Sequence, residues 1–255
     1  MKKIALALLA AATISAPAFA ADMAARPYAK APPAPVPVYS WTGCYIGAGG
    51  GGAYTVNDHY TVASTSGLPG GPFTPPISGE TTTGAHGWFG TVQAGCDYQF
   101  NNFVVGVFGD YDFMDVHGNT NSLFTFYGKQ RQDWQWSVGG RVGYLVFPQL
   151  LTYVSGGFTQ AHWKATDLTA FGAVVPTFTL LSQTRDGWFI GAGDEYALSF
   201  FPGLFWKTEY RYSEFDRATT AMNIFATPLY SGLSESQRVK EHSVRSELVW
   251  RFNWR

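Results

Sequence analysis

Charged residues recur at alternate positions in several stretches of the chain, and this spacing limits the chemistry that they can do. Asp110 and Asp112 form one such pair, while Lys207, Glu209 and Arg211 form a run of alternating sign. Paired carboxylates are suited to general acid–base catalysis. Here they share their pattern with bases, so we interpret them as ion-pair partners. The whole set comprises Asp97, Asp110, Asp112, Glu195, Glu209 and Glu247 with Arg141, Lys207, Arg211, Arg245 and Arg251.

The run Glu241, His242 and Ser243 contains the residue types of a serine hydrolase. Adjacent residues of a strand point to opposite faces, which prevents a direct hydrogen bond between His242 and Ser243. We therefore expect a protein that is not an enzyme and has no catalytic residues. A lipid A hydrolase that uses Ser243 is the less favoured alternative.

The chain has five histidines, and imidazole is a common ligand for metals and haem. No two of them have the close spacing of a ligand pair. We interpret them as solvated side chains at loops and strand ends, and we predict no metal site and no cofactor. They are His59, His86, His117, His162 and His242.

Strands are the elements that position the charged set. In one predicted strand, Phe103, Val105 and Val107 lie on one side, and Asp110 and Asp112 lie on the other. Side chains of a strand alternate between two faces, so this segment has an apolar face and a polar face. The alternation fits both a soluble barrel with an apolar interior and a membrane barrel with an apolar exterior.

Aromatic residues favour the membrane barrel, because they gather at both ends of the predicted strands, where the two membrane interfaces would lie. One group is Trp88, Trp134, Trp163 and Trp188, near the long loops. The other is Trp41, Tyr98, Phe100, Phe103, Tyr144, Phe147 and Trp254, near the short turns.

Eight such segments alternate with short turns and long loops, which is typical of an outer-membrane barrel. We predict an all-β fold, an eight-stranded antiparallel up-and-down transmembrane β-barrel. Its interior has just enough room for side chains, so the charged set is expected to plug the lumen. The faces of the first and fifth strands stay unassigned. The strands are expected at residues 41–56, 84–100, 103–116, 131–147, 150–165, 184–201, 204–220 and 241–255.

Composition agrees with a membrane protein. Hydrophobic residues make up 46% of the chain and charged residues 14%, whereas soluble domains carry about 25% charge. The net charge of −1 gives no basic field for nucleic acid. Residues 1–20, with Lys2 and Lys3 before an apolar run and cleavage after Ala20, are expected to be a signal peptide. Residues 21–40 are expected to form a Pro-rich periplasmic tether, and residues 41–255 the barrel.

Five motifs and the final strand carry a family resemblance. The motifs are S-W-T-G-C-Y-I-G at residues 40–47, Q-A-G-C-D-Y-Q-F-N-N-F-V-V-G at 93–106, G-G-R-V-G-Y at 139–144, Y-V-S-G-G at 153–157, and G-W-F-I-G-A-G-D-E-Y-A-L at 187–198. The chain resembles the small outer-membrane immunogenic proteins of alphaproteobacteria, a branch of the opacity-protein-like porin family. The resemblance implies a bacterial outer-membrane location, a role in envelope integrity, and loops that contact a host or environmental ligand. A small passive pore is the alternative function.

Cys44 and Cys96 are the two cysteines of the chain. The first lies near the start of one predicted strand and the second near the end of the next, so the two lie at similar heights on neighbouring strands. We predict a disulfide, with two independent lipid-facing thiols as the alternative.

Seven cations gather near the predicted external ends of the strands, interleaved with acids. They are expected either to pair with lipopolysaccharide phosphates or to form ordinary salt bridges with their neighbours. The seven are Lys129, Arg131, Lys164, Arg185, Arg217, Arg238 and Lys240.

The last strand is expected to carry the signal for the barrel assembly machinery, because Trp250, Phe252 and Trp254 alternate at its end. We predict that deleting residues 252–255 blocks assembly, whereas deleting Arg255 alone leaves it intact. Surface labelling of whole cells measures the outcome. Normal surface levels of the longer truncation would contradict the prediction.

Overall fold

The computed structural model describes residues 40–123 and 125–252, and the regular elements within them are all β-strands. None of the described residues form a helix long and apolar enough to cross a membrane. The predicted signal peptide, its cleavage at Ala20 and nearly all of the tether lie outside the described residues. The strands are β1 (Gly43–Ala63), β2 (Thr81–Phe100), β3 (Phe103–Ser122), β4 (Phe126–Phe147), β5 (Leu150–Trp163), β6 (Thr166–Ala170), β7 (Phe178–Leu180), β8 (Gln183–Ala197), β9 (Leu204–Ile224) and β10 (Tyr230–Phe252).

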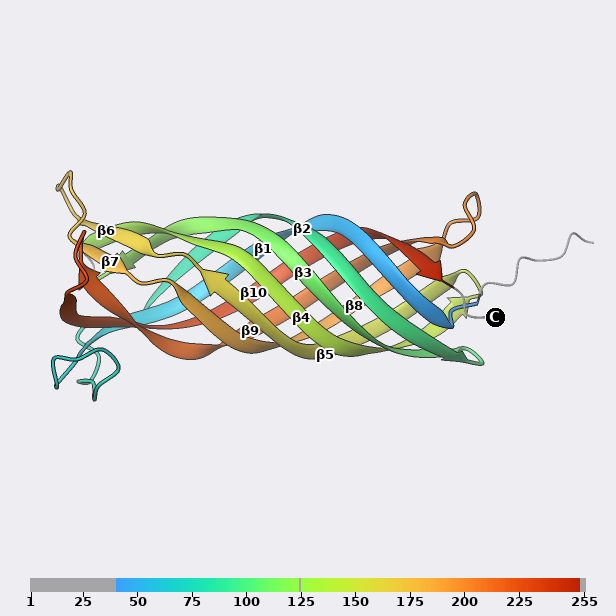
Figure 1. The fold of residues 1–255 in the computed structure, drawn as a ribbon, viewed down its shortest axis with the longest axis horizontal. Coiled ribbons are helices and arrows are strands. Elements are labelled where there is room, and N and C mark those ends of the chain that lie inside the picture. Colours follow the sequence, from blue (N-terminus) through green and yellow to red (C-terminus); the bar gives the residue numbers. More distant parts are fainter. Residues whose placement is uncertain (1–39, 124, 253–255) are drawn as a thin grey trace, which may run out of the picture. The chain divides into compact units, whose positions relative to one another are not determined.

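Eight of these strands close into an antiparallel ring in the order β10-β1-β2-β3-β4-β5-β8-β9, with β9 returning to β10 (Figure 1). The closing pair runs from Cys44 opposite Phe252 to Ala63 opposite Leu233. The eight-stranded antiparallel barrel predicted from the sequence is therefore confirmed.

β6 and β7 continue β5 and β8 and do not enlarge the ring. β5 ends with Trp163 opposite Gln183 of β8, and the pairing resumes with Thr166 of β6 opposite Leu180 of β7. β6 also pairs with β4, and β7 with β9. The two short strands lie together at one end of the barrel (Figure 1). We call this the loop end, and we call the opposite end, where residues 101–102 and 148–149 make short connections, the turn end.

The strands extend further at the loop end than the sequence predicted. Residues 57–63 and 230–239 were expected in loops, yet they belong to β1 and β10, and Asp58 pairs in register with Arg238. The predicted boundaries are wrong here because polar residues occupy both faces of these segments, as Asn57 and Asp58 do in β1, which weakens the apolar alternation. The backbone hydrogen bonds between paired strands do not depend on a difference between an apolar and a polar face, so the pairing continues.

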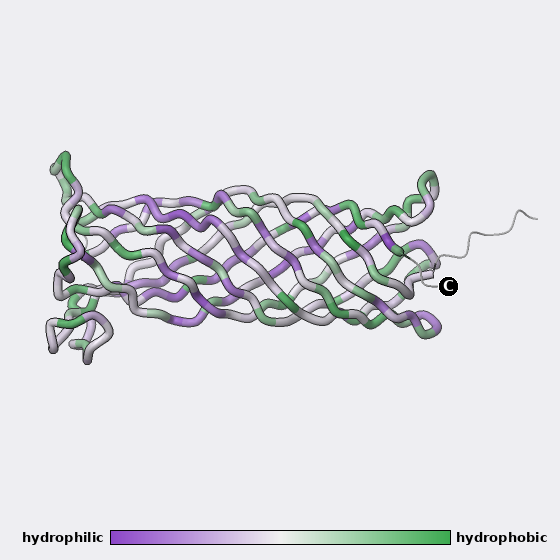
Figure 2. Tube along the Cα trace, in the orientation of Figure 1, coloured by the Kyte–Doolittle hydropathy of each residue, from purple (hydrophilic) through white to green (hydrophobic). Residues whose placement is uncertain are grey.

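The outer wall is apolar, as predicted. On β3, Val107 is 66% exposed and Phe113 is 59% exposed, whereas Asp110 and Asp112 of the same strand are buried. Hydrophobic stretches cover the tube toward the turn end, and hydrophilic ones are more frequent toward the loop end (Figure 2). The apolar wall is the surface that would face hydrocarbon.

Two of the predicted interface aromatics point inward. Trp41 is fully buried and Trp163 is 3% exposed, so their assignment to the two outer aromatic bands was wrong. Both lie at ends of strands, where the alternation that assigns a face is least constrained. Trp254 lies outside the described residues. The outward aromatics are Trp88, Tyr98, Phe100, Phe103, Tyr144, Phe147 and Trp188, all more than 40% exposed, and the half-buried Trp134.

Glycines in β1 allow β10 and a buried ring to come close. A Cβ on Gly51 would lie 2.1 Å from the carbonyl oxygen of Val244 and 2.7 Å from the ring of Phe89. These contacts assign the faces of β1, which the sequence left unassigned: Gly47, Gly49 and Gly51 face the lumen.

Cys44 and Cys96 are register partners on β1 and β2 and are joined by a disulfide with an S–S distance of 2.02 Å. The bond lies on the outer wall near the turn end. It ties the first two strands of the ring together.

We predict that mass mapping of the mature protein without reductant finds a peptide cross-linked through Cys44 and Cys96. Reduction should lower the temperature at which the folded gel band disappears by a few degrees, because a disulfide restricts the unfolded chain. The Cys44→Ser/Cys96→Ser variant, which has no bond to reduce, is the control. Two free thiols in the untreated protein would refute the bridge.

Candidate functional site

The lumen holds a network of buried charges, and the first layer lies near the turn end. Asp97 of β2 and Glu195 of β8 lie between Arg141 of β4 and Arg251 of β10, and the two arginines come from opposite sides of the ring. Arg251 donates to Asp97 at 2.7 Å and to Glu195 at 2.7 Å. Arg141 donates to Asp97 at 3.0 Å and to Glu195 at 2.9 Å. Each carboxylate thus bridges both guanidinium groups, and the four side chains form a closed square across the lumen.

Aromatic rings pack above and below this square. The Tyr45 ring lies 4.8 Å from the guanidinium carbon of Arg141 and 4.9 Å from that of Arg251. Trp41 stacks below Arg251 at 4.8 Å and donates its indole hydrogen to the carbonyl oxygen of Pro148 at 3.2 Å. Trp41 therefore covers the lumen at the turn end, a role that the sequence did not predict.

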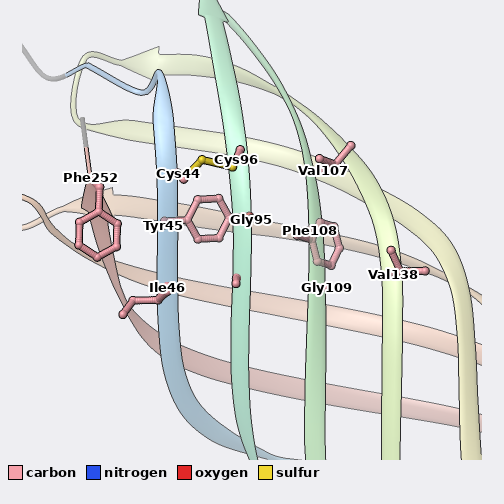
Figure 3. A pocket seen from close by; sticks show the side chains of 11 residues that line it. Cys44, Tyr45, Ile46, Gly95, Cys96, Val107, Phe108, Gly109, Val138 and Phe252 are labelled. Atoms are coloured by element: carbon pink, nitrogen blue, oxygen red, sulfur yellow. A yellow bond between two sulfur atoms is a disulfide. The ribbon is translucent and has the colours of Figure 1, made fainter. Parts of the chain in front are cut away.

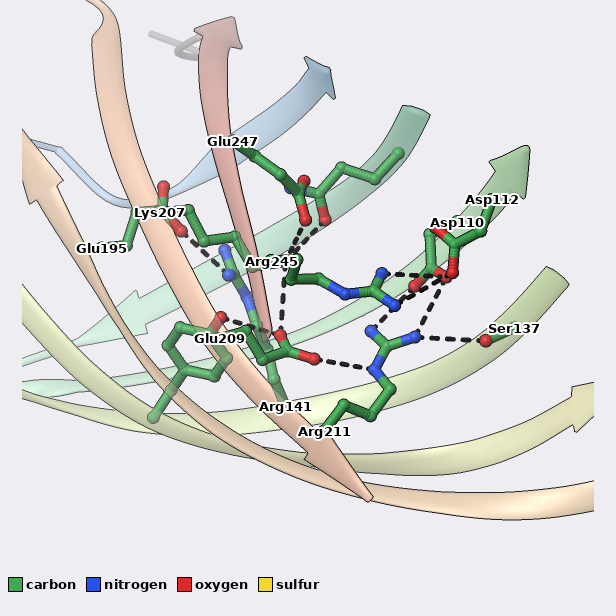
Figure 4. A network of polar contacts seen from close by, with 12 residues as sticks. Asp110, Asp112, Ser137, Arg141, Glu195, Lys207, Glu209, Arg211, Arg245 and Glu247 are labelled. Atoms are coloured by element: carbon green, nitrogen blue, oxygen red, sulfur yellow. Dashed lines mark hydrogen bonds and ion pairs between the residues drawn. The ribbon is translucent and has the colours of Figure 1, made fainter. Parts of the chain in front are cut away.

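A second layer is built around Arg211 (Figure 4). Its two terminal nitrogens bind the two oxygens of Asp110 at 3.0 and 2.9 Å, and its Nε donates to Glu209 at 2.8 Å. Arg245 donates to Asp112 at 3.0 Å and lies 3.3 Å from Asp110. The bidentate geometry is the strongest form of this contact. The carboxylate pair of Asp110 and Asp112 is thus occupied by two guanidinium groups.

Lys207 lies beside the second layer and is held less tightly. Its ammonium group donates to Gln93 at 2.8 Å and lies 3.4 Å from Glu209 and 3.7 Å from Glu247. Neither oxygen of Glu247 accepts a hydrogen bond from the described residues. All eleven charged residues that the sequence assigned to the lumen are buried there, but they differ widely in how firmly they are held.

Three further lumen charges were missed by the sequence, which had placed Arg185 and Glu241 at the outer rim. Glu241 is 1% exposed and accepts a hydrogen bond from Gln132 at 3.1 Å. Arg185 is 2% exposed, lies over the Trp163 ring and donates to the carbonyl oxygen of Gln237 at 2.8 Å. Glu241 lies in the predicted strand of residues 241–255 and shares the parity of Arg245 and Glu247, so the alternation along β10 was the signal that could have placed it inward.

Glu235 is the third missed charge, and it lies beyond the aromatic band at the loop end. Thr61 and Ser122 each donate to its carboxylate at 2.9 Å. His59, expected to be solvated, is only 2% exposed. Its Nε2 lies 2.7 Å from the carbonyl oxygen of Asn121 and 3.9 Å from Glu235. The prediction for His59 was wrong because β1 continues into the region assigned to a loop.

Two carboxyl groups beyond the aromatic band have shifted pKa values of opposite sign. Burial raises the pKa of Glu235 above its usual range, although nearby His59 opposes the shift. The hydroxyl hydrogen bond from Thr82 lowers the pKa of Asp58, with further help from Lys240. Ionised Asp58 therefore stabilises this end above its ordinary pKa, and the contribution is lost as the pH falls through the lowered value.

Five of the seven cations predicted at the rim lie on the outer wall paired with acids. Arg131 lies 3.1 Å from Asp115, for example, and Arg217 lies 3.0 Å from Glu80. The other three pairs join Lys164 to Asp133, Arg238 to Glu214, and Lys240 to Asp58. Lys129 is also exposed on this wall. The geometry fits the salt-bridge interpretation of this rim.

The hydrolase residues are separated as expected from their alternation. Ser243 is 2% exposed and faces the lumen, whereas His242 faces outward and its Nδ1 lies 2.7 Å from the hydroxyl of Tyr210. Among the described residues no group of three or more His, Cys, Asp and Glu could hold a metal. The Ser243 hydroxyl has no hydrogen-bond partner among the described residues, so it is not paired with a base there.

A small cavity lies in the lumen toward the loop end. It lies among Asn57, Gln130, Gln132 and Trp163 and has a volume of about 10 Å³, which is roughly the room that one water molecule requires. Above it, the side chains of Leu168, Leu180 and Met222 form a buried apolar cluster at the loop end. The charge layers are thus flanked by apolar groups at both ends.

A larger cavity of about 500 Å³ is a groove on the outer wall (Figure 3). Gly95 and Gly109 leave it open, while Ile46, Val107 and Val138 line it. It adjoins the disulfide and contains no ionisable side chain except the inward Tyr45. The groove belongs to the apolar wall and offers no catalytic group.

A closed ring, an apolar wall with aromatics at both ends, and a charged lumen together define a transmembrane β-barrel of the bacterial outer membrane. The chain matches the family described as outer membrane protein beta-barrel domain over residues 6–252, and it belongs to that family. The turn end is accordingly periplasmic and the loop end external.

Curated relatives agree with this assignment. The chain is 30% identical to the 31 kDa outer-membrane immunogenic protein of Brucella melitensis over 268 residues, which cover 99% of this chain and 100% of the relative. It is 29% identical to the 22 kDa outer membrane protein of Rhizobium leguminosarum bv. viciae, covering 71% and 68% of the two chains. Among solved structures, the outer membrane protein OprG from Pseudomonas aeruginosa aligns with a TM-score of 0.49 at 13% identity, covering 83% and 97%.

We predict that Asp97→Ala destabilises the barrel far more than Glu247→Ala. The first substitution leaves two buried guanidinium groups with Glu195 as their one shared carboxylate among the described residues, and breaking such buried pairs costs about 3–5 kcal/mol. The second leaves Lys207 with Gln93 and Glu209. The midpoint temperature of the heat-dependent gel shift measures both. Equal midpoints for the two variants would show that the square of ion pairs contributes no special stability.

Proposed function

We propose that the protein is a non-enzymatic structural barrel of the outer membrane whose lumen is closed to ions and solutes. The observation that carries this proposal is the square formed by Asp97, Glu195, Arg141 and Arg251. It spans the lumen from opposite strands, and each of its carboxylates bridges both guanidinium groups.

The energetics of the network support closure. A hydrated ion that passed the square would have to separate buried charges from their partners, and each separation leaves an uncompensated charge in a medium of low dielectric constant. Arg211 and Arg245 repeat the obstacle one layer further along. The bulky cover of Trp41 at the periplasmic end adds a steric barrier.

A structural role in the envelope is supported by the closed barrel, in which each strand of the ring pairs with a neighbour on both sides. The β10–β1 pairing leaves no open sheet edge in the hydrocarbon. For assembly, we propose recognition of the outward aromatics Trp250 and Phe252 of β10 by the barrel assembly machinery. For lipid contact, we propose that the outward cations of the external rim can separate from their carboxylate partners and pair with lipopolysaccharide phosphates instead.

A second part of the proposal concerns the external loops, which we expect to contact a host or environmental ligand. The Brucella relative bears the word immunogenic in its name, which supports loops exposed at the cell surface. The long connection at residues 64–80 and the β6–β7 hairpin are the most prominent of these segments.

We predict that the purified mature protein gives no reproducible unitary current steps in planar lipid bilayers. Folded protein, verified by its heat-dependent gel shift, is required for the measurement. Trp41→Ala should also be silent, because the two charge layers remain after the aromatic cover is lost. Steps of constant size from the unmodified protein would instead support a small passive pore.

A further inference from the structure

Four segments at the external end of the barrel, made of connections and the strand ends beside them, contain no acidic or basic side chain. We call these segments the crown, and define it as residues 64–79, 118–128, 168–182 and 218–234. Charged residues such as Glu80 and Glu235 lie directly next to them in the chain. None of the four segments contains Asp, Glu, Lys, Arg or His. Surface loops normally carry charge, so four uncharged segments at one end of a barrel need an explanation.

Large apolar side chains are exposed on the crown. On the connection between β6 and β7, Phe171 is 84% exposed, Val174 is 96% exposed and Val175 is 64% exposed. Leu68 and Leu229, on two other connections, are 64% and 62% exposed. The tip between β6 and β7 projects from the end of the barrel and is among the hydrophobic parts of the trace (Figures 1 and 2).

The exposed tips are held in place by the rest of the crown. Phe171 donates its backbone hydrogen to the carbonyl oxygen of Thr125 at 2.8 Å, and its ring lies 6.5 Å from that of Tyr127. Phe225 donates its backbone hydrogen to Thr177 at 3.0 Å. The connections of β3–β4, β6–β7 and β9–β10 are therefore linked, and they present their apolar residues from one hydrogen-bonded platform.

The apolar tips are not displaced parts of the core. Leu168, Leu180 and Met222 already fill the space below them and are buried. Val174 and Val175 lie at the tip of the β6–β7 hairpin, beyond this cluster, and the buried space below them is already filled.

The crown also stands well clear of the barrel's own membrane. β1 continues for nine residues from the outward Tyr54 to Ala63, which corresponds to roughly 20 Å at the usual strand rise and barrel tilt. The ion pairs of the rim, such as that of Arg217 with Glu80, lie between the level of Tyr54 and the crown. The crown therefore reaches out past the headgroup level and past the rim charges.

We propose that the crown docks onto an apposed lipid bilayer with an electrically neutral surface, and that its apolar tips insert at the headgroup boundary. This inference rests on the proposed role of the external loops. A sulfated glycan would require a basic field, which the crown lacks. A protein ligand usually needs a pocket for a buried anchor, whereas these apolar residues project from separate loops. Projecting apolar side chains on an uncharged support match interfacial insertion.

The test uses the full mature protein in phospholipid nanodiscs, mixed with phosphatidylcholine vesicles and separated by flotation. We expect the protein to float with the vesicles, with little change between low and high salt. Val174→Ser/Val175→Ser should weaken the association about tenfold or more, because it removes apolar area that the bilayer would bury. Val174→Ser alone should have a smaller effect in the same direction.

The control is Phe200→Ser, which removes an exposed ring, 77% exposed, from the periplasmic connection between β8 and β9. It should float like the unmodified protein. Each variant is first shown to keep its heat-dependent gel shift, so a loss of flotation is not a loss of fold.

Three outcomes would overturn the inference. Unchanged flotation of the double valine variant would show that the tips do not insert. Competition by heparin or loss of binding at high salt would indicate a charged partner. Crown-dependent association of nanodiscs without vesicles would indicate a second copy of the chain. Unitary current steps in planar bilayers would contradict the closed lumen but would not change the flotation result. The closed lumen and the docking of the crown can therefore fail separately.

Discussion

The whole structure depends on satisfying every backbone hydrogen bond inside a lipid bilayer. A sheet in hydrocarbon cannot keep a free edge, because each unpaired N–H or C=O group costs several kcal/mol. The pairing of β10 with β1, from Cys44 and Phe252 to Ala63 and Leu233, removes that edge. With eight strands, the closed ring leaves only enough interior for side chains. Ring closure therefore determines that the inward residues must contact one another across the lumen.

Crowding in the lumen explains why its charges are paired and why small residues accompany them. Asp97 can reach Arg141 only because Gly106 has no side chain, since a Cβ there would lie 1.9 Å from a carboxylate oxygen of Asp97. Rings such as Tyr45 and Phe189 fill the space that the ion pairs leave, and each also lies against a guanidinium group. The lumen is thus a mixed polar and aromatic core in which apolar packing and ion pairing support the same geometry.

The two ends of the barrel solve different problems. The periplasmic end turns in a few residues, as at Asn101, which adopts a positive φ of 53°, and it is covered from within by Trp41. The external end continues its ladder beyond the membrane with polar residues on both faces and finishes in the uncharged crown. Its interior contains Glu235 and His59 in a hydrogen-bonded cluster. The barrel is therefore longer than the bilayer requires, and the surplus length carries the surface that meets the exterior.

The sequence by itself determined the number of strands in the ring, the outward and inward faces of β3 and β4, and the eleven charges that line the lumen, because a period of two is a local property of each strand. Only the tertiary structure decided which charges pair, since Asp97 and Arg251 are brought together by ring closure and register. It also decided that Glu235 and His59 point inward, because their segments were not predicted as strands and lack the apolar contrast that would assign a face. Trp41 became an interior cover for a related reason: it precedes the first ladder pair, where packing against Phe205 and Arg251 decides its direction.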